Sequence, residues 1–559
     1  LTLLRWLHFY LNELSTPHVT VVLSDEEIVE EPKGIECHDP ATGERLGCIT
    51  QDTAATVAEK IERARAAQRV WSQSTFRERR RLLRCLLRVT LENQEAICRV
   101  SARDSGKPLI DAGFGEVLVT CEKINWLLSE GEKWLKPEER SSGTMVFYKR
   151  AWVEYRPVGV MGCIVPWNYP FHNLLNPLTA NVFAGNSLVI KVSEHACWSA
   201  CLYLRLIRAC LTACGAPPDL LQVVYGYGEV GSALVEGPID KITFVGSTQI
   251  GKLVMRSASL RPTPVVLELG GKDAFIVRAD ADLSQVVPIA LRGAFQSAGQ
   301  NCTGAERFFI HESILDEFLR RVCDVVKDMR IGPPLGGHVD MGAMCMLSQP
   351  AKIQQLIDDA VAKGARLVMG GKLVGPQSHF YPPTVLVGIK RGMLIWDEEV
   401  FGPVMGVATF STDEEAVRFA NDSNFGLGAS VFTRDRAIGR AIASQMDSGM
   451  ASINDFASNY MCQSLPFGGV KASGFDRFAG IEGLRGCCHI KSLAQDKWGG
   501  LIDTRLPPLL SYPVGESGFS FVCALCHLFY GRMGERLSAC WRLAITSMAR
   551  KSASKPKAS

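Results

Sequence analysis

The stretch VEYRPVGVMGCIVPW, residues 153–167, predicts a strand, a turn containing proline and glycine, and a second, more apolar strand. Short apolar runs rich in β-branched residues then alternate with helical patterns along the chain. Strands that alternate with helices are typical of parallel α/β sheets. The runs expected to form strands in this first series are 186–193, 220–226, 241–247, 264–271 and 273–278.

A second series of the same kind begins at residue 306, so we expect two successive α/β domains with a cleft between them. Its candidate strands are 306–313, 365–374, 382–389, 403–410 and 428–433. The chain before residue 153 has a different pattern. Residues 12–36 are polar and acidic, as in a linker, and helical periodicity starts at Thr53.

The composition excludes some classes of protein. The 559 residues carry a net charge of only +3, without the concentrated basic patch of a nucleic-acid-binding protein. Several of the 19 cysteines lie inside apolar runs, as Cys85 and Cys163 do. A large chain with its own core needs no disulfide framework, so we expect free thiols in a reducing compartment.

The two ends of the chain differ from its middle. Residues 1–11, LTLLRWLHFYL, are too few to span a bilayer, which takes about 20 apolar residues. We expect either the remnant of a membrane anchor or a short amphipathic helix. Residues 518–531 and 537–548 predict amphipathic helices, followed by a disordered basic end. This tail is expected either to lie on a membrane surface or to cover the catalytic domain.

Two motif matches are interpreted as chance. Residues 226–231, GYGEVG, match a dinucleotide-binding fingerprint, but strands already precede them and Asp240 comes too early to bind a ribose. We expect a glycine-rich turn there. Residues 523–527, CALCH, match a haem-attachment pattern in a weakly patterned tail, and in a cysteine-rich chain such a match carries little weight.

Three stretches carry residues suited to one chemistry. Asn168, after an apolar strand, offers a neutral amide that could stabilise an oxyanion, although a turn asparagine is the alternative. Glu268 interrupts an apolar strand, where burial would raise its pKa and suit it to general-base work; the alternative is an edge residue paired with Lys272. Cys302 lies in a small polar loop, where we expect a thiol accessible enough to react, unless it is a bystander.

Read together, these stretches resemble the aldehyde dehydrogenase superfamily. LELGGKDA (267–274) is similar to its glutamate signature, FQSAGQNCTGAER (295–307) to its cysteine signature and PWNYP (166–170) to its asparagine motif. FVGSTQIG (244–251), EVFGP (399–403) and PFGGVKASG (466–474) match further motifs in family order. Residues 121–137, 453–469 and 474–485 look most like the plant and fungal branch called family 22, which includes membrane-anchored forms.

The resemblance implies an α/β fold in three parts: a Rossmann-like cofactor domain, an α/β catalytic domain and a small β hairpin for oligomerisation. On this basis residues 1–36 would be an N-terminal segment, 37–144 and 158–269 the NAD-binding domain, and 270–481 the catalytic domain. Residues 145–157 and 482–499 would form the oligomerisation element of a homodimer or homotetramer, and 500–559 an extension.

The resemblance also implies a reaction, the oxidation of an aldehyde to a carboxylic acid. Cys302 would attack the aldehyde, Asn168 and the backbone N–H of Cys302 would hold the oxyanion, and Glu268 would activate water to hydrolyse the thioester. The alternatives are a relative that forms acyl-CoA or reduces an acyl phosphate, against which the presence of Glu268 argues, and a scaffold without catalysis. Phe171, Asn301, Thr303 and Phe456 would line a partly apolar substrate tunnel.

The implied cofactor is NAD, with NADP as the alternative, and no metal is expected. A carboxylate beside the adenine ribose accepts from its 2′-hydroxyl but repels a 2′-phosphate, which favours NAD. The family's cofactor positions carry over to Trp167, Lys191, Glu194, Gly246, Ser247, Glu399 and Phe401.

Two residues depart from the family pattern. Val192 stands where proline is usual, and we expect little effect because both neighbouring contact side chains remain. Asp476 stands where glycine is usual. If that position needs a positive φ, aspartate can adopt it at a cost of roughly 1 kcal/mol.

Overall fold

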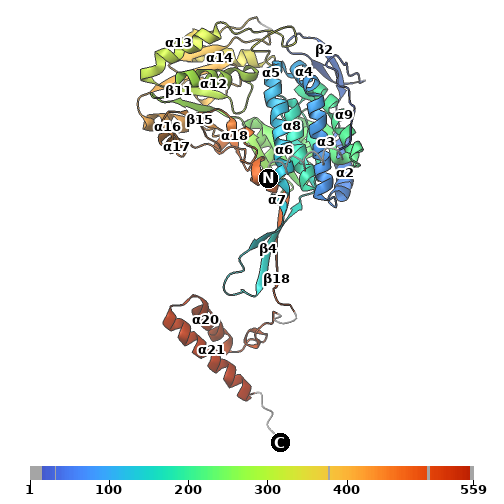
Figure 1. Ribbon diagram of the computed structural model, residues 1–559, viewed down its shortest axis with the longest axis vertical. Coiled ribbons are helices and arrows are strands. Elements are labelled where there is room, and N and C mark those ends of the chain that lie inside the picture. The colour runs from blue at the N-terminus through green and yellow to red at the C-terminus, as the bar shows by residue number, and fades with distance from the viewer. Residues whose placement is uncertain (1–15, 32, 376–377, 500–503, 554–559) are drawn as a thin grey trace, which may run out of the picture. The chain divides into compact units, whose positions relative to one another are not determined.

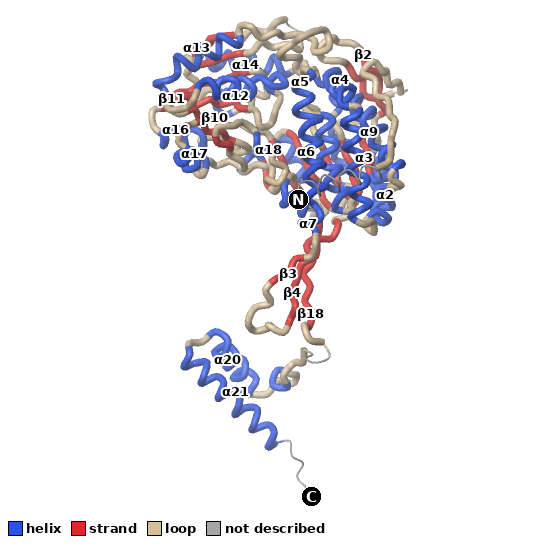
Figure 2. Tube along the Cα trace, viewed as in Figure 1, coloured by secondary structure: helices blue, strands red, loops and turns tan. Residues whose placement is uncertain are grey.

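The computed structural model describes residues 16–31, 33–375, 378–499 and 504–553. The predictions made for residues 1–11 and for the basic end beyond 553 lie outside these ranges. The chain divides into two compact units, the first formed by 1–135 and 157–489 and the second by 136–156 and 490–559 (Figures 1 and 2).

The first unit contains a six-stranded sheet built from the first α/β series. Its order is β17-β9-β8-β5-β6-β7, and every pairing is parallel except that of β17 with β9. The strands are β5 (Val160–Ile164), β6 (Ser187–Lys191), β7 (Leu221–Val224), β8 (Lys241–Gly246), β9 (Val265–Leu269) and β17 (Gly474–Phe475). The parallel sheet expected from the alternating pattern is confirmed.

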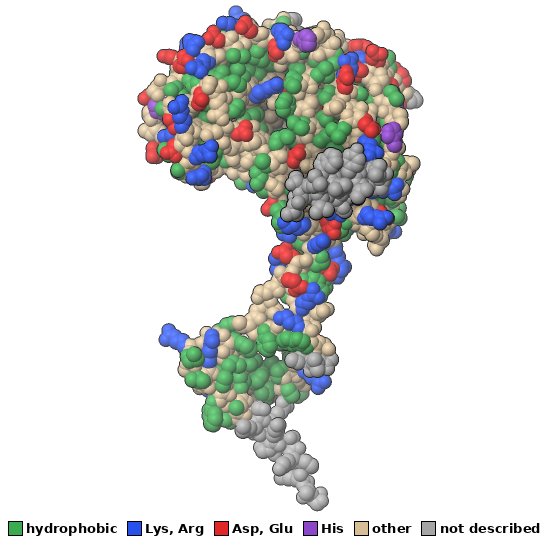
Figure 3. Space-filling view, in the orientation of Figure 1, with side chains coloured by type: hydrophobic (Ala, Val, Ile, Leu, Met, Phe, Trp, Pro, Cys, Tyr) green, Lys and Arg blue, Asp and Glu red, His purple; other side chains and the backbone are tan. Residues whose placement is uncertain are grey.

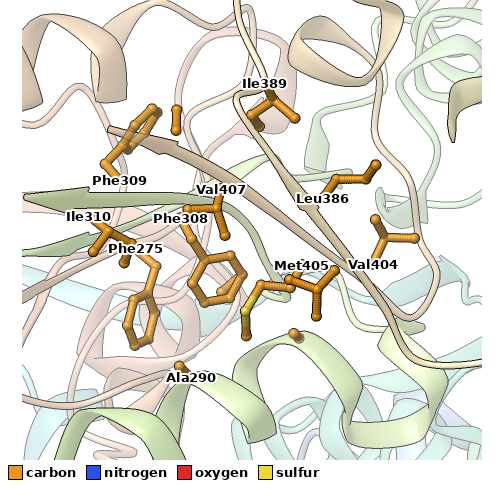
Figure 4. Close-up of a cluster of buried hydrophobic side chains, with 14 of the residues drawn as sticks. Phe275, Ala290, Phe308, Phe309, Ile310, Leu386, Ile389, Val404, Met405 and Val407 are labelled. Carbon is orange, nitrogen blue, oxygen red and sulfur yellow. The ribbon is translucent and has the colours of Figure 1, made fainter. Parts of the chain in front are cut away.

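The second series, together with β10, which was predicted as the last strand of the first series, forms a seven-stranded sheet with order β12-β13-β14-β11-β10-β15-β16, in which only β12 runs antiparallel. Phe275, Phe308 and Val407 belong to its buried core, which Figure 4 shows. The strands are β10 (Asp273–Val277), β11 (Ala305–His311), β12 (Arg366–Met369), β13 (Thr384–Val387), β14 (Val404–Phe410), β15 (Ala429–Phe432) and β16 (Ser452–Ile453). The two α/β series predicted from the sequence therefore form two separate sheets.

The helical segment before residue 153 begins as its sequence predicts. Thr53 and Thr75 each close a capping box at the start of α2 (Ala54–Trp71) and α3 (Phe76–Glu92), which satisfies backbone N–H groups that a helix start leaves open. α4 (Gln94–Ser105), α6 (Val119–Trp126) and α8 (Pro170–Ala184) follow, and α6 lies between two π-helical turns, Gly113–Leu118 and Leu127–Gly131. These helices supply the residues behind the site described below.

One stretch of the described helices, Glu194–Ala213, is long and apolar enough to cross a membrane. It includes α9 (Cys197–Ala213), and two thirds of the apolar window is buried inside the first unit. Such burial is typical of a core helix.

The second unit contains a three-stranded sheet with order β18-β4-β3. Its strands are β3 (Glu138–Arg140), β4 (Lys149–Pro157) and β18 (Cys488–Asp496). β4 begins four residues later than the start of the predicted hairpin at 145, because residues 144–148 form turns. The helices α20 (Ser517–Tyr530) and α21 (Met533–Ala553) follow, as the amphipathic patterns indicate.

Candidate active site

The three stretches singled out in the sequence meet at one cavity of about 710 Å³ in the first unit. Asn168 enters it from the loop after β5, Glu268 from β9, and Cys302 from the loop before β11. The three side chains are separated by up to 134 positions in sequence. They converge because the two sheets place these loops around one opening.

Cys302 is held in a loop with unusual backbone geometry. Ser297 and Ala298 have φ angles of 51° and 54°, a left-handed conformation that costs a residue with a side chain about 1 kcal/mol or more. The Ser297 backbone N–H donates to the Asp111 carboxylate at 2.8 Å, and Asp111 also pairs with Arg292 at 2.6 Å. These contacts stabilise the loop and fix where the thiol lies.

The Cys302 thiol is accessible from the cavity, as its loop setting predicts, in contrast to the buried Cys85 and Cys163. It is only partly exposed and borders the cavity, and burial followed by the nearby Glu268 charge raises its pKa well above the ordinary range. The thiol is therefore protonated at neutral pH. It needs a base before it can act as a nucleophile, since the thiolate is the reactive form.

Glu268 is a buried carboxyl that interacts with the Cys302 thiol. Its side chain is buried, and burial raises its pKa to about 8, while interaction with the Cys302 thiol lowers it. Among the described residues its Oε1 has no hydrogen-bond partner. Lys272 does not pair with Glu268, because its ammonium binds Glu306 at 2.7 Å; the alternative of a simple edge ion pair is wrong.

The two glycines after Glu268 are required by close approach. A Cβ at Gly271 would lie 2.3 Å from the backbone oxygen of Cys302, and one at Gly270 would lie 2.4 Å from the Glu399 carboxylate. No larger residue could occupy either position without moving the site. The sequence GG in this signature therefore brings β9 and the Cys302 loop together.

Asn168 contacts the loop that carries Cys302, and a buried lysine holds its backbone oxygen. Its amide donates to the backbone oxygen of Gln300 at 3.2 Å and carries a second N–H for another acceptor. Lys107, which is buried, donates to the Asn168 backbone oxygen at 2.5 Å and to Glu116 at 2.7 Å. An amide held in this way is suited to stabilising an oxyanion formed at Cys302.

Replacing Lys107 by methionine is expected to lower the free energy of unfolding by about 3 kcal/mol, because Glu116 would remain as a buried, unpaired charge. Urea unfolding measures this change. The double variant Lys107→Met/Glu116→Gln removes both charges and should recover most of the loss. Equal stability of the single variant and the wild type would contradict the buried pair.

Several predicted cofactor residues lie along the same cavity. Gly246 ends β8, and Ser247 caps α11 (Thr248–Ser259), with its hydroxyl accepting from the Ile250 N–H. A helix start that opens into a cavity presents backbone N–H groups to an anion. The Trp167 and Phe401 rings meet edge to face at 5.7 Å and also line the cavity.

Glu399 completes this end of the cavity, accepting from the Gly271 N–H at 2.9 Å. Burial and the neighbouring Glu306 raise its pKa to about 8. Glu306 in turn accepts from the N–H groups of Val400 and Phe401, so it fixes the segment that carries Glu399.

Lys191 and Glu194 do not line this cavity, but Lys191 ends β6, which pairs with β5 and β7, at the same carboxyl edge of the sheet as Trp167 and Ser247. Their side chains lie 3.6 Å apart. A dinucleotide binds along the carboxyl edge of a parallel sheet, so the arrangement of these residues fits such a ligand.

Phe171 is a correction to the sequence prediction. It is fully buried and contacts Tyr203 edge to face at 5.0 Å, away from the cavity wall. Asn301, Thr303 and Phe456 do line the cavity, as predicted. Asp476 has a φ of 65°, so the condition stated for that position, a positive φ adopted by aspartate, is met.

Another part of the cavity wall was not predicted from the sequence. α8 contributes His172, whose Nδ1 lies 2.8 Å from the Thr120 hydroxyl and whose Nε2 meets the Tyr460 hydroxyl. Burial and the positive charge of Lys123 lower the pKa of His172 to about 3, so the ring is neutral. In the sequence, a histidine within an apolar helix does not indicate such a hydrogen-bond network.

This chain is similar to proteins of a known family. Residues 28–493 match the aldehyde dehydrogenase family. An aldehyde dehydrogenase-like protein of Schizosaccharomyces pombe is 40% identical over 504 residues, which cover 89% of this chain and 96% of that protein.

Two solved structures share the fold. Aldehyde dehydrogenase of Mycobacterium tuberculosis complexed with NAD⁺ is 30% identical with a TM-score of 0.78, covering 85% of this chain and 98% of that one. Succinic semialdehyde dehydrogenase of Streptococcus pyogenes complexed with NADP⁺ is 26% identical with a TM-score of 0.77, covering 82% and 99%. Because the family match covers most of this chain, the chain belongs to the aldehyde dehydrogenase family and is an NAD(P)-dependent aldehyde dehydrogenase.

Proposed function

We propose that the chain oxidises an aldehyde to a carboxylic acid through a covalent intermediate on Cys302. The observation that carries the proposal is the meeting of a thiol, a buried carboxyl and an amide, Cys302, Glu268 and Asn168, at one cavity. Each side chain has the chemistry of one role in such a reaction.

In the first half of the reaction, the Glu268 carboxylate takes the proton of the Cys302 thiol. The sulfur then forms a bond to the aldehyde carbon, and the carbonyl electrons move to its oxygen. The second N–H of the Asn168 amide and the Cys302 backbone N–H donate to this oxyanion. Removing one such donor typically lowers the rate by about 10²–10³-fold.

NAD(P), when bound, supplies the oxidation by accepting a hydride from the carbon attached to Cys302, which leaves a thioester. Ser247, Glu399, Phe401 and Trp167 would hold it beside the thiol. In the second half, Glu268, after releasing the thiol proton to solvent, takes a proton from water, and the water oxygen attacks the thioester carbon. The carbon–sulfur bond then breaks to release the carboxylic acid, and the Cys302 thiolate takes the proton back from Glu268. The Oε1 of Glu268 has no hydrogen-bond partner among the described residues, so it is available to accept from that water.

We infer a preference for NAD over NADP from the Lys191–Glu194 pair at the sheet edge. The Glu194 carboxylate would accept from a ribose 2′-hydroxyl and repel a 2′-phosphate. The 19 cysteines, all of them free thiols, favour a reducing compartment for the enzyme.

The cavity favours medium or long aliphatic or aromatic aldehydes. Phe114, Phe456 and Phe467 provide apolar surface along it, and its volume accommodates more than a two- or three-carbon substrate. In a series of straight-chain aldehydes, we expect kcat/KM, followed by NADH absorbance, to rise with chain length. A decline from acetaldehyde onward would contradict this substrate class.

We also propose a homodimer or homotetramer. β18 is an edge strand of its sheet and most of it is exposed, including Ile490 at 64%. An exposed edge can pair with the same edge of another chain. Light scattering is expected to give at least twice the 61.2 kDa of one chain; a monomer mass would contradict the proposal.

A further inference from the structure

The helical hairpin formed by α20 and α21 lies beyond residue 493, where the match to the family ends. The two helices contact each other, and Ala524 and Ala539, one on each helix, are buried. Neither the reaction nor the cofactor accounts for this hairpin.

The hairpin exposes large apolar side chains on both helices. α20 contains no Asp, Glu, Lys or Arg, yet Phe519 and Tyr530 are 78% and 68% exposed. On α21, Met533, Leu537 and Trp541 are 76%, 66% and 70% exposed. Hydrophobic side chains gather on the hairpin (Figure 3). A helix that is apolar on all sides normally lies in a core, so this concentration indicates a surface that is covered in use.

The charge of the same segment identifies the kind of surface that covers it. Residues 517–559 contain seven Lys or Arg and one acidic residue, Glu535, a net charge of +6. The remaining 516 residues carry 54 basic and 57 acidic side chains, a net charge of −3. The positive excess of the chain therefore lies entirely in this tail. Arg532, Arg536 and Arg542 are exposed on the described part.

We propose that the α20–α21 hairpin docks on the surface of an anionic lipid bilayer. Exposed aromatic and aliphatic side chains beside arginines are the features of helices that lie in the interface between headgroups and acyl chains. Trp541 and Tyr530 are of the residue types that concentrate at this depth. Each exposed cation adds attraction to anionic headgroups.

The lengths of the two helices favour lying on the bilayer over crossing it. The 14 residues of α20 extend about 21 Å, less than the roughly 30 Å hydrocarbon core. α21 is longer, but Glu535, Arg536 and Arg542 lie along it, and charged groups in the hydrocarbon core are costly.

The test uses the full chain and sedimentation with lipid vesicles. We expect binding to phosphatidylcholine vesicles containing roughly 30% phosphatidylserine, weaker binding to phosphatidylcholine alone, and further weakening by salt. The variant Phe519→Ser/Trp541→Ser is expected to bind the anionic vesicles at least about tenfold more weakly, because two large apolar side chains leave the interface.

The matched control is Val22→Ser/Leu260→Ser, which changes two apolar residues of the first unit that are 81% and 72% exposed. It should bind like the wild type. Circular dichroism verifies that both variants are folded. Wild-type protein that stays in the supernatant, or equal binding by Phe519→Ser/Trp541→Ser, would overturn the proposal. A variant with lower oligomer mass and unchanged vesicle binding would assign the hairpin to self-association instead.

Discussion

Cys302→Ala is expected to abolish NADH formation from every aldehyde, lowering kcat by about 10⁴-fold or more, as is typical for loss of a nucleophile. Burial keeps the thiol protonated at rest, and Cys302 lines the cavity together with its proposed base, Glu268, and its proposed oxyanion donor, Asn168. Stopped-flow absorbance and binding of NAD are the measurements. Binding of NAD should be retained, because the cofactor residues are untouched.

The matched control is Cys462→Ala, which removes an exposed thiol. It should leave kcat and KM unchanged. If Cys302→Ala retained more than about a tenth of the wild-type rate, another group would be the nucleophile and the proposed reaction would be wrong.

Glu268→Gln is expected to separate the two halves of the reaction. Turnover should fall by about 10²–10⁴-fold, since water loses its general base. Glutamine cannot take the thiol proton either, so the first turnover should also slow at neutral pH and recover as hydroxide deprotonates Cys302 at high pH. Once that turnover is complete, NADH formation should stop at one equivalent per active site.

The pKa of Glu268 also predicts a pH dependence. A carboxyl with a pKa of about 8 is mostly protonated at pH 7 and becomes the active base as pH rises. In the wild type, kcat/KM should therefore increase with pH through about 8, and in Glu268→Gln this limb should shift to the higher pH at which hydroxide deprotonates Cys302. The control Glu482→Gln, which changes an exposed carboxylate, should keep it. A flat wild-type profile would contradict the role of Glu268.

The sequence predicted the parts of the fold that depend on local pattern. The apolar run 241–247 contains β8, and the residue that follows the strand, Ser247, caps a helix as its side chain favours. Asn168, Glu268 and Cys302 could be named because strand ends and polar loops are visible in sequence. That they share one cavity came only from the resemblance.

Contacts between residues that are distant in the chain could not be predicted from local sequence patterns. Lys107 lies in the loop after α4 and Glu116 in the π-helical turn Gly113–Leu118, and neither stretch gives a sign in sequence of a buried ion pair. Lys107 also reaches a backbone oxygen 61 residues away. Phe171 was misplaced because its position beside Asn168 suggested the cavity, whereas the helix rotates it toward Tyr203. The polar loop predicted an accessible Cys302 thiol, but its composition does not reveal which side chains lie beside that thiol.

A mass measurement on Glu268→Gln tests most directly whether Cys302 carries the covalent intermediate. The variant would be incubated with NAD and hexanal at high pH, quenched in acid, digested and analysed for the peptide that contains Cys302. We expect this peptide to gain the mass of one acyl group, and the corresponding peptide of Cys302→Ala/Glu268→Gln to gain none. An unmodified Cys302 peptide after one equivalent of NADH has formed, or an acyl group on another cysteine, would contradict it.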